Sequence, residues 1–362
     1  MKALTYGGPG VRTWDTVPDP AVEEPTDVVV EISSSTICGT DLHILKGDVP
    51  TVAEGRILGH EAVGTVVAAG PAVTTVSEGD RVLVSCITSC GRCRFCKEGR
   101  YGLCVGGGGW ILGHLIDGLQ AEYARVPFAD TSVYPVPEGL TDEQVLFLAD
   151  ILPTGFEVGV LNGGVRPGDT VAVVGAGPIG LAAIMTARLF TPGRVIAIDL
   201  ADARLAQAVE FGADVTINNG AENAVESVKE LTDGLGADVA VEAVGIPETF
   251  ELCTELIRPG GRVANVGVHG HPATLHLETL WIRGITVTTG LVDTFTTPQL
   301  LKLIQGGRLD PTVFATHRFP LGETMEAYDV FAAAAETHAL KVVLEGERAV
   351  KEAPKALAGA LA

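Results

Sequence analysis

Between residues 171 and 289, short apolar segments alternate with segments of helical pattern, and this alternation constrains the fold more than any other feature of the chain. The expected strands are Val171–Val174, Arg194–Asp199, Val215–Ile217, Asp238–Ala243, Arg262–Val266 and Ile285–Thr289. The expected helices are Gly177–Phe190, Ala203–Phe211, Glu222–Thr232 and Pro247–Ile257. Because strands that alternate with helices pair in parallel, the segment predicts a doubly wound α/β sheet.

A glycine-rich turn, Gly175-Ala176-Gly177-Pro178-Ile179-Gly180, follows the first of these strands and opens a helix. Such a turn lets a pyrophosphate approach the helix N-terminus, where backbone amides and the helix dipole favour an anion. Asp199 ends the next strand, where a carboxylate accepts hydrogen bonds from the adenosine ribose and disfavours a 2′-phosphate. The context predicts NAD rather than NADP, although Arg204 could loosen that preference. The alternative is a glycine-rich turn of another α/β protein, in which Asp199 only caps a helix.

The apolar stretch Val171–Phe190 raises the question of a membrane span. Glycines and a proline interrupt it, so a strand, a turn and a helix explain it better than one span. At the N-terminus, Gly7-Gly8-Pro9-Gly10 comes before any apolar signal region can form. We therefore expect a cytoplasmic protein that binds no membrane.

Composition narrows the class of protein further. The chain has 362 residues, which is too long for one small core and comfortable for two domains. Apolar residues make up 46% and charged residues 19%, a composition that favours a folded protein over a disordered one. Its formal net charge of -20 repels phosphate backbones and anionic lipids. Nucleic acid is therefore excluded as an expected partner.

The regions that flank the alternating segment differ from it. The first 150 residues are mainly short β runs separated by Gly, Pro and Ser, and the pattern becomes helical near Leu140–Asp150. After Val292 we expect helices at Pro298–Gly306 and around Gly322–Ala335, a strand at Lys341–Glu345, and a frayed helix in the tail Arg348–Ala362. We predict one domain of residues 1–152 and 293–362, and a second domain of residues 153–292.

Four of the seven cysteines crowd together, with the spacing Cys90-x2-Cys93-x2-Cys96-x7-Cys104. An odd number of cysteines without a secretory signal argues against a disulfide framework. Four thiolates satisfy tetrahedral zinc and leave no open position, which is typical of a structural site that supplies folding energy. The pattern predicts a structural zinc site, with an iron–sulfur cluster as the remaining alternative.

A second set of metal-binding side chains is dispersed along the chain: Cys38, His60, Glu61 and Asp150. A catalytic zinc needs about three protein ligands and one exchangeable position, and Cys, His and carboxylate are all competent ligands. Spacing alone does not assemble this set, and an isolated histidine such as His60 is more often an ordinary hydrogen-bonded residue.

Taken together, Cys38-Gly39-Thr40-Asp41, Gly59-His60-Glu61, the four-cysteine lobe and Gly175–Gly180 resemble the zinc-containing medium-chain alcohol dehydrogenases. The resemblance covers Met1 to about Glu345. It implies a GroES-like, mainly-β catalytic domain, with the structural zinc lobe at about residues 86–106. It also implies a Rossmann NAD-binding domain, with the active site in the cleft between the two domains.

The resemblance assigns the catalytic zinc ligands. Cys38, His60 and Asp150 are expected to hold the metal, and Glu61 lies beside it and ligates it transiently during exchange. Asp41 is expected to orient His60 through the other ring nitrogen. Asp150 stands where the animal enzymes have Cys, as in several bacterial and secondary-alcohol relatives.

The resemblance also assigns the proton path and the cofactor contacts. Thr40 matches the hydroxyl residue that takes the substrate proton, and His43 matches the histidine that passes it toward solvent. Expected cofactor contacts are Thr154, Val268 and Leu291 at the nicotinamide end, Arg204 near the adenosine ribose, and Lys341 near the ribose or pyrophosphate. Trp110 and Ile87 are expected to line the substrate pocket.

These residues predict a reversible hydride transfer between a small primary or secondary alcohol and NAD, giving an aldehyde or ketone. One catalytic and one structural zinc are expected in each chain, in a homo-oligomer for which a tetramer is favoured over a dimer. A polyol, threonine or formaldehyde dehydrogenase has the same ligands and stays open, as does an enzyme that mainly reduces aldehydes. A non-catalytic NAD-binding protein is a more distant alternative.

Overall fold

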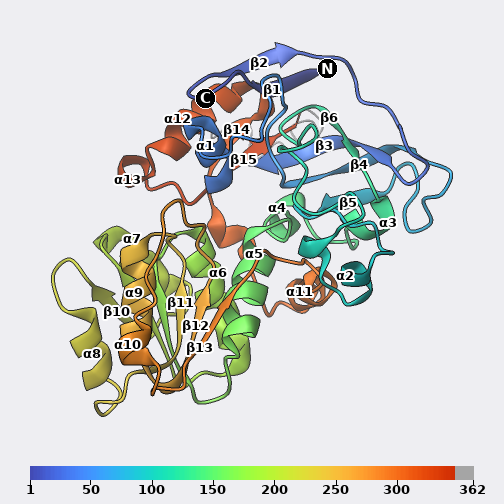
Figure 1. The fold of residues 1–362 in the computed structure, drawn as a ribbon. Coiled ribbons are helices and arrows are strands. Elements are labelled where there is room, and N and C mark those ends of the chain that lie inside the picture. Colours follow the sequence, from blue (N-terminus) through green and yellow to red (C-terminus); the bar gives the residue numbers. More distant parts are fainter. Residues whose placement is uncertain (347–362) are drawn as a thin grey trace. The chain divides into compact units, whose positions relative to one another are not determined.

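The computed structural model describes residues 1–346 of the chain (Figure 1). These residues divide into two compact units: unit 1 is Met1–Asp150 together with the segment from Asp293 onward, and unit 2 is Ile151–Val292. The tail Arg348–Ala362, for which we expected a frayed helix, lies outside the described residues.

Unit 2 is built on a six-stranded sheet in the order β10-β9-β8-β11-β12-β13. Its strands are β8 (Thr170–Val174), β9 (Arg194–Asp199), β10 (Val215–Asn218), β11 (Ala237–Glu242), β12 (Ile257–Asn265) and β13 (Thr286–Thr289). Every neighbouring pair is parallel. The predicted doubly wound parallel sheet is therefore confirmed.

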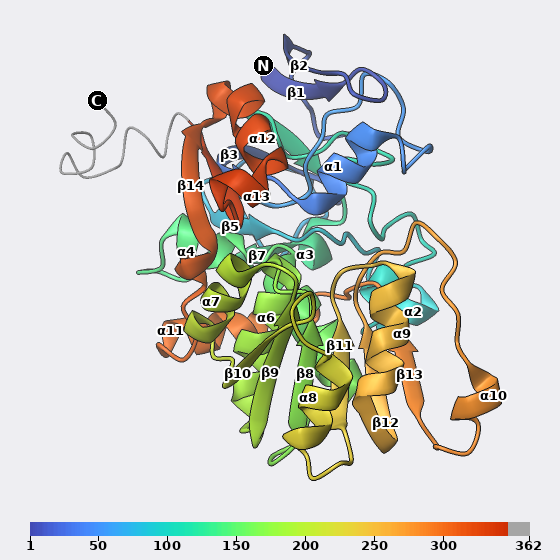
Figure 2. The ribbon, with the colours of Figure 1, turned by 90° about the vertical axis from the view of Figure 1, so that its left-hand side faces the viewer.

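Helices precede and connect these strands. They are α5 (Ile151–Thr154), α6 (Pro178–Ala187), α7 (Asp202–Glu210), α8 (Ala224–Glu230), α9 (Pro247–Leu256) and α10 (Leu277–Leu280). Figures 1 and 2 show α8 and α9 on one face of the sheet, where Val228 and Cys253 pack on buried strand residues such as Ile196 and Val263. A π-helix that the sequence pattern did not predict, Gly155–Leu161, continues α5.

The apolar stretch at residues 171–190 forms strand β8, a glycine turn and helix α6, as predicted. Another stretch, Asp142–Leu161, is long and apolar enough to cross a bilayer, with a mean hydropathy of 1.4 in the most apolar part. However, 78% of that part is buried inside the protein, which is typical of a core helix in a soluble protein.

Unit 1 contains a seven-stranded sheet in the order β14-β15-β3-β4-β5-β7, with β6 added beside β3. Its strands are β3 (Val28–Thr36), β4 (Ala62–Ala69), β5 (Arg81–Val84), β6 (Tyr123–Val126), β7 (Val133–Pro135), β14 (Ala315–Pro320) and β15 (Lys341–Glu345). Strand β15 pairs antiparallel with β3, so residues near position 343 lie beside residues near position 35.

The remaining elements of unit 1 surround this sheet. They are the hairpin of β1 (Lys2–Tyr6) and β2 (Arg12–Thr16), and the helices α1 (Gly39–Lys46), α2 (Arg94–Lys97), α3 (Ala129–Ser132), α4 (Asp142–Leu146), α11 (Thr297–Gln305), α12 (Thr324–Ala332) and α13 (Ala334–Thr337). One core cluster packs α1 and α12 together through Ile44 and Tyr328, and it also contains Ile37 beside the candidate site. At the surface, Asp130 accepts hydrogen bonds of 2.6–3.0 Å from the amides and hydroxyls of Thr74 and Thr75.

Candidate metal centres and nucleotide pocket

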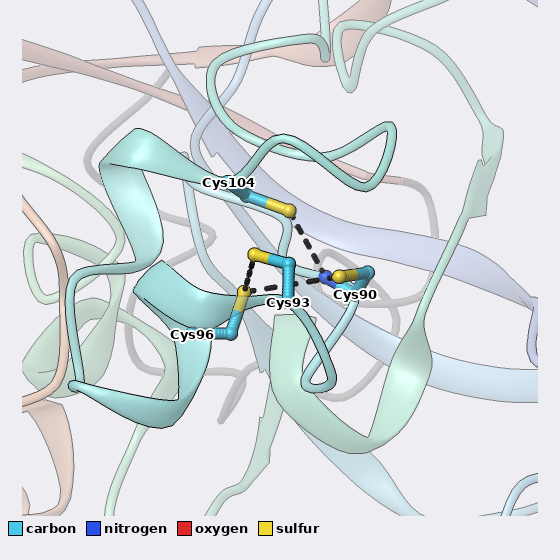
Figure 3. Close-up of side chains that lie close together, drawn as sticks. All are labelled: Cys90, Cys93, Cys96 and Cys104. Carbon is cyan, nitrogen blue, oxygen red and sulfur yellow. Dashed lines mark hydrogen bonds between the residues drawn. The ribbon is translucent and has the colours of Figure 1, made fainter.

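The four predicted lobe cysteines converge around one point (Figure 3). The Sγ atoms of Cys90, Cys93, Cys96 and Cys104 all lie within 4.8 Å of one another. Cys93 Sγ is 3.4 Å from Cys96 Sγ, which in turn is 3.9 Å from Cys90 Sγ. The short helix α2 produces this proximity, because Cys93 precedes its first residue and Cys96 lies one turn later.

The surroundings of these sulfurs favour the thiolate at Cys93 and Cys104 but not at Cys96. The amides of Cys90 and Gly106 each donate to Cys104 Sγ at 3.4 Å. Backbone hydrogen bonds lower the pKa of Cys93 to about 6, whereas burial raises the pKa of Cys96 to about 12. A Cβ atom at position 106 would overlap Cys90 Sγ, so glycine is required there. Four convergent sulfurs with amide donors fit the donor set of a structural zinc.

The second predicted set also comes together. One ligand atom from each of Cys38, His60, Glu61 and Asp150 lies within 4.8 Å of the others. His60 Nε2 is 3.4 Å from Asp150 Oδ2 and 3.9 Å from Glu61 Oε1, and Cys38 Sγ is 3.8 Å from Asp150 Oδ2. Burial lowers the pKa of His60, but contacts with Asp150 and Cys38 outweigh it and raise that pKa well above its usual value.

Helix α1 positions Cys38 and its neighbours. Cys38 is the N-cap residue of α1, and its amide donates to Asp41 Oδ2 at 3.0 Å, so the carboxylate satisfies a donor at the helix start. The helix buries Asp41, Ile44 and Leu45. A sulfur, an imidazole and two carboxylates around a partly open point fit the donor set of a catalytic zinc.

Asp41 lies next to His60, and its role in orienting the His60 ring stays a prediction. Asp41 Oδ1 lies 3.7 Å from His60 Nδ1, and neither buried atom has a hydrogen-bond partner within residues 1–346. The other carboxylate oxygen accepts from Gln120 Nε2 at 3.1 Å, and Tyr328 donates to Gln120 Oε1 at 2.8 Å. Gln120 and Tyr328 are fully buried, and sequence reasoning missed both residues because they lie far along the chain from Asp41.

Lys341, predicted to contact the cofactor, has its side chain inside unit 1. Its Nζ donates to Glu61 Oε1 at 2.7 Å and to the carbonyl of Ile37 at 2.9 Å, and both charged side chains are 1% exposed. Burial lowers the pKa of Lys341, but the Glu61 carboxylate outweighs it and raises that pKa. This contact with a metal-site residue was not predicted, and the cofactor contact stays a prediction.

The predicted relay residues lie on the same helix as Cys38. Thr40 and His43 are three positions apart on α1 and therefore share a side of it. Thr40 Oγ1 is 3.7 Å from Cys38 Sγ. His43 is half exposed, and its Nδ1 hydrogen-bonds to Asp48 Oδ2 at 2.8 Å. Of the predicted pocket residues, Ile87 is buried and Trp110 stacks on His114.

Unit 2 has a cavity of about 620 Å³ at the carboxyl ends of β8, β9 and β11. Residues that line it include Gly175, Asp199 and Arg204, all predicted to bind the cofactor. Gly175 has a φ of 97°, a conformation that favours glycine, and Pro178 occupies the first turn of α6. Parallel sheets bind nucleotides at the carboxyl ends of their strands, where this cavity lies.

The residues predicted at the nicotinamide end lie elsewhere in unit 2. Among the described residues, the lining of this cavity includes none of Thr154, Val268 and Leu291, the residues predicted at the nicotinamide end. Val268 is 75% exposed and Leu291 49% exposed. Asp199 accepts hydrogen bonds from the amides of Ala176, Leu200 and Ala201.

Comparison with known proteins gives a consistent result. Residues 24–138 match the alcohol dehydrogenase GroES-like domain, and residues 178–306 match the zinc-binding dehydrogenase domain. An alcohol dehydrogenase of Cupriavidus necator is 39% identical over 358 residues, covering 92% of this chain and 95% of that protein. An L-threonine 3-dehydrogenase of Bacillus licheniformis is 34% identical over 339 residues, covering 91% of this chain and 95% of that protein.

The fold agrees with a solved structure as well. The zinc-dependent alcohol dehydrogenase 2 from Streptococcus pneumonia superposes with a TM-score of 0.92 at 50% sequence identity, covering 96% of this chain and 99% of that chain. These matches confirm the expected GroES-like and Rossmann folds and an oxidoreductase that acts on CH–OH groups. The chain belongs to the zinc-containing alcohol dehydrogenase family.

Proposed function

We propose that this protein is an NAD-linked alcohol dehydrogenase that interconverts a small primary or secondary alcohol and its aldehyde or ketone. The convergence of Cys38, His60, Glu61 and Asp150 in unit 1 is the observation that carries the proposal. We propose that residues 1–152 and 293–362 form the catalytic domain and residues 153–292 the cofactor-binding domain.

Cys38, His60 and Asp150 would hold the catalytic zinc, and Glu61 would assist during exchange. When bound, zinc supplies Lewis acidity that polarises the oxygen of the alcohol or carbonyl. Asp41 would fix the orientation and protonation of the His60 ring from behind, because its carboxylate faces Nδ1. The four-cysteine lobe would hold the second zinc, which stabilises the fold.

Thr40 and His43 are suited to move the alcohol proton. A hydroxyl near the metal ligands can accept that proton and release its own, and a half-exposed imidazole can pass one to solvent. Asp48 accepts from His43 Nδ1 in the tautomer that leaves Nε2 as the proton acceptor. The direction of net flux follows the supply of alcohol, aldehyde and cofactor.

The nucleotide cavity of unit 2 favours NAD. Asp199 places a carboxylate beside the glycine turn, where it can accept the adenosine ribose hydroxyls and repel a 2′-phosphate. Arg204 Nη1 lies 4.0 Å from Asp199 Oδ2, so its charge is partly engaged by that carboxylate. The exposed side chains of Leu200 and Ile246 add apolar surface to the cavity.

The test combines zinc analysis with NAD reduction. The wild-type chain should contain two zinc ions and should reduce NAD with at least one of ethanol, 2-propanol, benzyl alcohol and a polyol. Cys38→Ser and His60→Ala should each lose one zinc and nearly all turnover. Cys253→Ser and His317→Ala are matched controls, because neither residue belongs to either metal set. Full turnover of Cys38→Ser without the second zinc would refute the assignment.

Threonine oxidation is the second candidate, favoured by the similarity to an L-threonine 3-dehydrogenase. Polyol and formaldehyde dehydrogenases use the same ligand types, so the substrate panel should also contain L-threonine, sorbitol and formaldehyde with glutathione. The substrate with the highest kcat/KM decides among them. Binding of zinc and NAD without turnover of any substrate would favour a non-catalytic NAD-binding protein.

We also propose that the protein is a cytoplasmic homo-oligomer, with a tetramer favoured over a dimer. Two features of unit 2 support association: β13 ends the sheet, and Trp281 and Ile282 nearby are each 73% exposed. Open sheet edges and large apolar side chains favour contact with another chain. Light scattering after size-exclusion chromatography tests this, and Ile282→Glu should reduce the mass if this surface is used.

A further inference from the structure

Helix α9 presents glutamates to the nucleotide cavity of unit 2. Glu248, Glu251 and Glu255 all line the cavity, together with Thr249 and Leu252. Their spacing of three and four positions places them along one side of the helix. Glu248 and Glu255 are exposed, and the Glu251 side chain is 36% exposed, so all three carboxylates contact solvent.

The cavity is therefore strongly acidic. Asp199 contributes a fourth carboxylate, and Arg204 is the only lysine or arginine among the described lining residues. His276, from the segment before α10, approaches Glu251 Oε2 at 3.7 Å, but it also hydrogen-bonds to Glu278. Negative charge dominates the cavity even after these partners are counted.

We propose that Glu248, Glu251 and Glu255 form a second determinant of cofactor choice, which acts with Asp199 to exclude the 2′-phosphate of NADP. The inference rests on the proposed nucleotide site and extends it to residues outside the glycine motif. NAD and NADP differ at this end only by a phosphate that carries almost two negative charges. Carboxylates on α9 raise the free energy of NADP binding more than that of NAD binding through long-range repulsion of the added phosphate.

The expected effect is moderate. For charges about 10 Å from the phosphate in about 0.1 M salt, screened Coulomb interactions with three carboxylates give about a fivefold change in relative affinity. The effect should shrink to about twofold or less in 1 M salt, because screening weakens long-range repulsion. The Asp199 contribution should be larger, since that carboxylate is placed to meet the ribose itself.

The test compares the triple variant E248Q/E251Q/E255Q with the control E222Q/E226Q/E230Q. The control removes the same charge from the same unit, at and just before α8, outside the cavity. The dissociation constants of NADH and NADPH are measured by nicotinamide fluorescence at low and high salt, and thermal unfolding checks the fold of each variant. The proposal predicts that the NADPH-to-NADH ratio of Kd falls about fivefold in the α9 variant at low salt and changes little in the control.

Each other outcome refutes the proposal in a recognisable way. If the wild-type protein binds NADH but the folded α9 variant shows the same NADPH-to-NADH ratio of Kd, the inference is wrong. The proposed NAD site is not affected by that result. An equal fall in both variants assigns the effect to net charge rather than to α9. Failure of the wild-type protein to bind either dinucleotide overturns the proposed cofactor site and the inference with it.

Discussion

Replacing Lys341 by Met removes the cation that faces Glu61 inside unit 1. Both side chains are 1% exposed and their charged atoms are 2.7 Å apart, so water cannot replace the lost partner. The Glu61 carboxylate, 3.9 Å from His60, would remain buried among the proposed metal ligands. The Ile37 carbonyl would also lose its donor.

The burial of both side chains determines how much free energy of unfolding is lost when one partner is removed. Removing one partner of a buried ion pair typically costs about 3–5 kcal/mol, because the other charge is left uncompensated. Replacing both partners by neutral groups costs less, since no charge is then buried alone. Lys341→Met and Glu61→Gln should therefore destabilise unit 1 separately, and the double variant should recover at least about 2 kcal/mol of the summed loss.

A double-mutant cycle measures this coupling. Guanidinium unfolding is followed by tryptophan fluorescence in a Trp281→Phe background, so that the signal comes from Trp14 and Trp110, which both lie in unit 1. Zinc content is measured for every variant, because Glu61 lies beside the proposed metal site. Only variants with equal zinc content are compared.

The pair Arg318–Glu143 provides the matched control. It belongs to the same unit and has a bidentate contact at 2.6 and 2.7 Å, but its side chains are 42% and 24% exposed. The same substitutions, Arg318→Met and Glu143→Gln, should give a coupling of about 1 kcal/mol or less. A Lys341–Glu61 coupling no larger than the control would refute the reasoning from burial.

Burial opposes ionisation of Asp130, but the bonds from its two threonine neighbours outweigh it and lower its pKa from 3.8 to about 2. The folded-state pKa lies below the unfolded value, so the Asp130 carboxylate stabilises the protein above about pH 4, and this stabilisation is lost as the pH falls toward 2. After a discount for the exposure of the carboxylate, the stabilisation is about 1 kcal/mol. Urea unfolding at several pH values should show Asp130→Asn less stable than wild type at pH 7, with the gap closing in acid. Gly106→Ala should lose one zinc per chain, because the added methyl group would overlap Cys90 Sγ. Gly322→Ala is the control and should keep both zinc ions, since Gly322 has open space around it. Equal zinc content in the two variants would contradict the predicted overlap at Cys90. Tyr328→Phe should lower the free energy of unfolding by about 1–2 kcal/mol, because Gln120 Oε1 loses its donor, and an unchanged denaturation midpoint would contradict this.

The sequence predicted unit 2 better than unit 1 for a physical reason. Strand β9 was predicted with its observed bounds, because a buried parallel strand is a continuous apolar run between turns. Helix α1 was missed: it is short, begins with glycine, and buries the polar Asp41. Strand β14 was missed because every second residue is exposed and the segment contains charged and polar side chains.

The candidate site shows the same division. The four lobe cysteines are close in sequence, so their spacing alone predicted a shared metal. Cys38 and Asp150 are 112 positions apart, and only family resemblance joined them before the structure placed them near each other. The hydrogen bonds that hold the site residues in place also join distant positions. The bond from Tyr328 to Gln120 spans 208 positions, so no local sequence pattern predicts it.

The pairing of β15 with β3 has a consequence for the order of folding during synthesis. The Thr36 hydroxyl bonds to the Val342 carbonyl across 306 positions, so the sheet of unit 1 cannot close until almost the whole described chain has left the ribosome. Unit 2 is continuous in sequence and can form its sheet earlier, while the part of β3 at Ser34–Thr36 still lacks its β15 partner. A nascent chain halted before residue 341 therefore exposes an open strand and lacks the cation that faces Glu61, which makes this stage of synthesis the one most prone to aggregation.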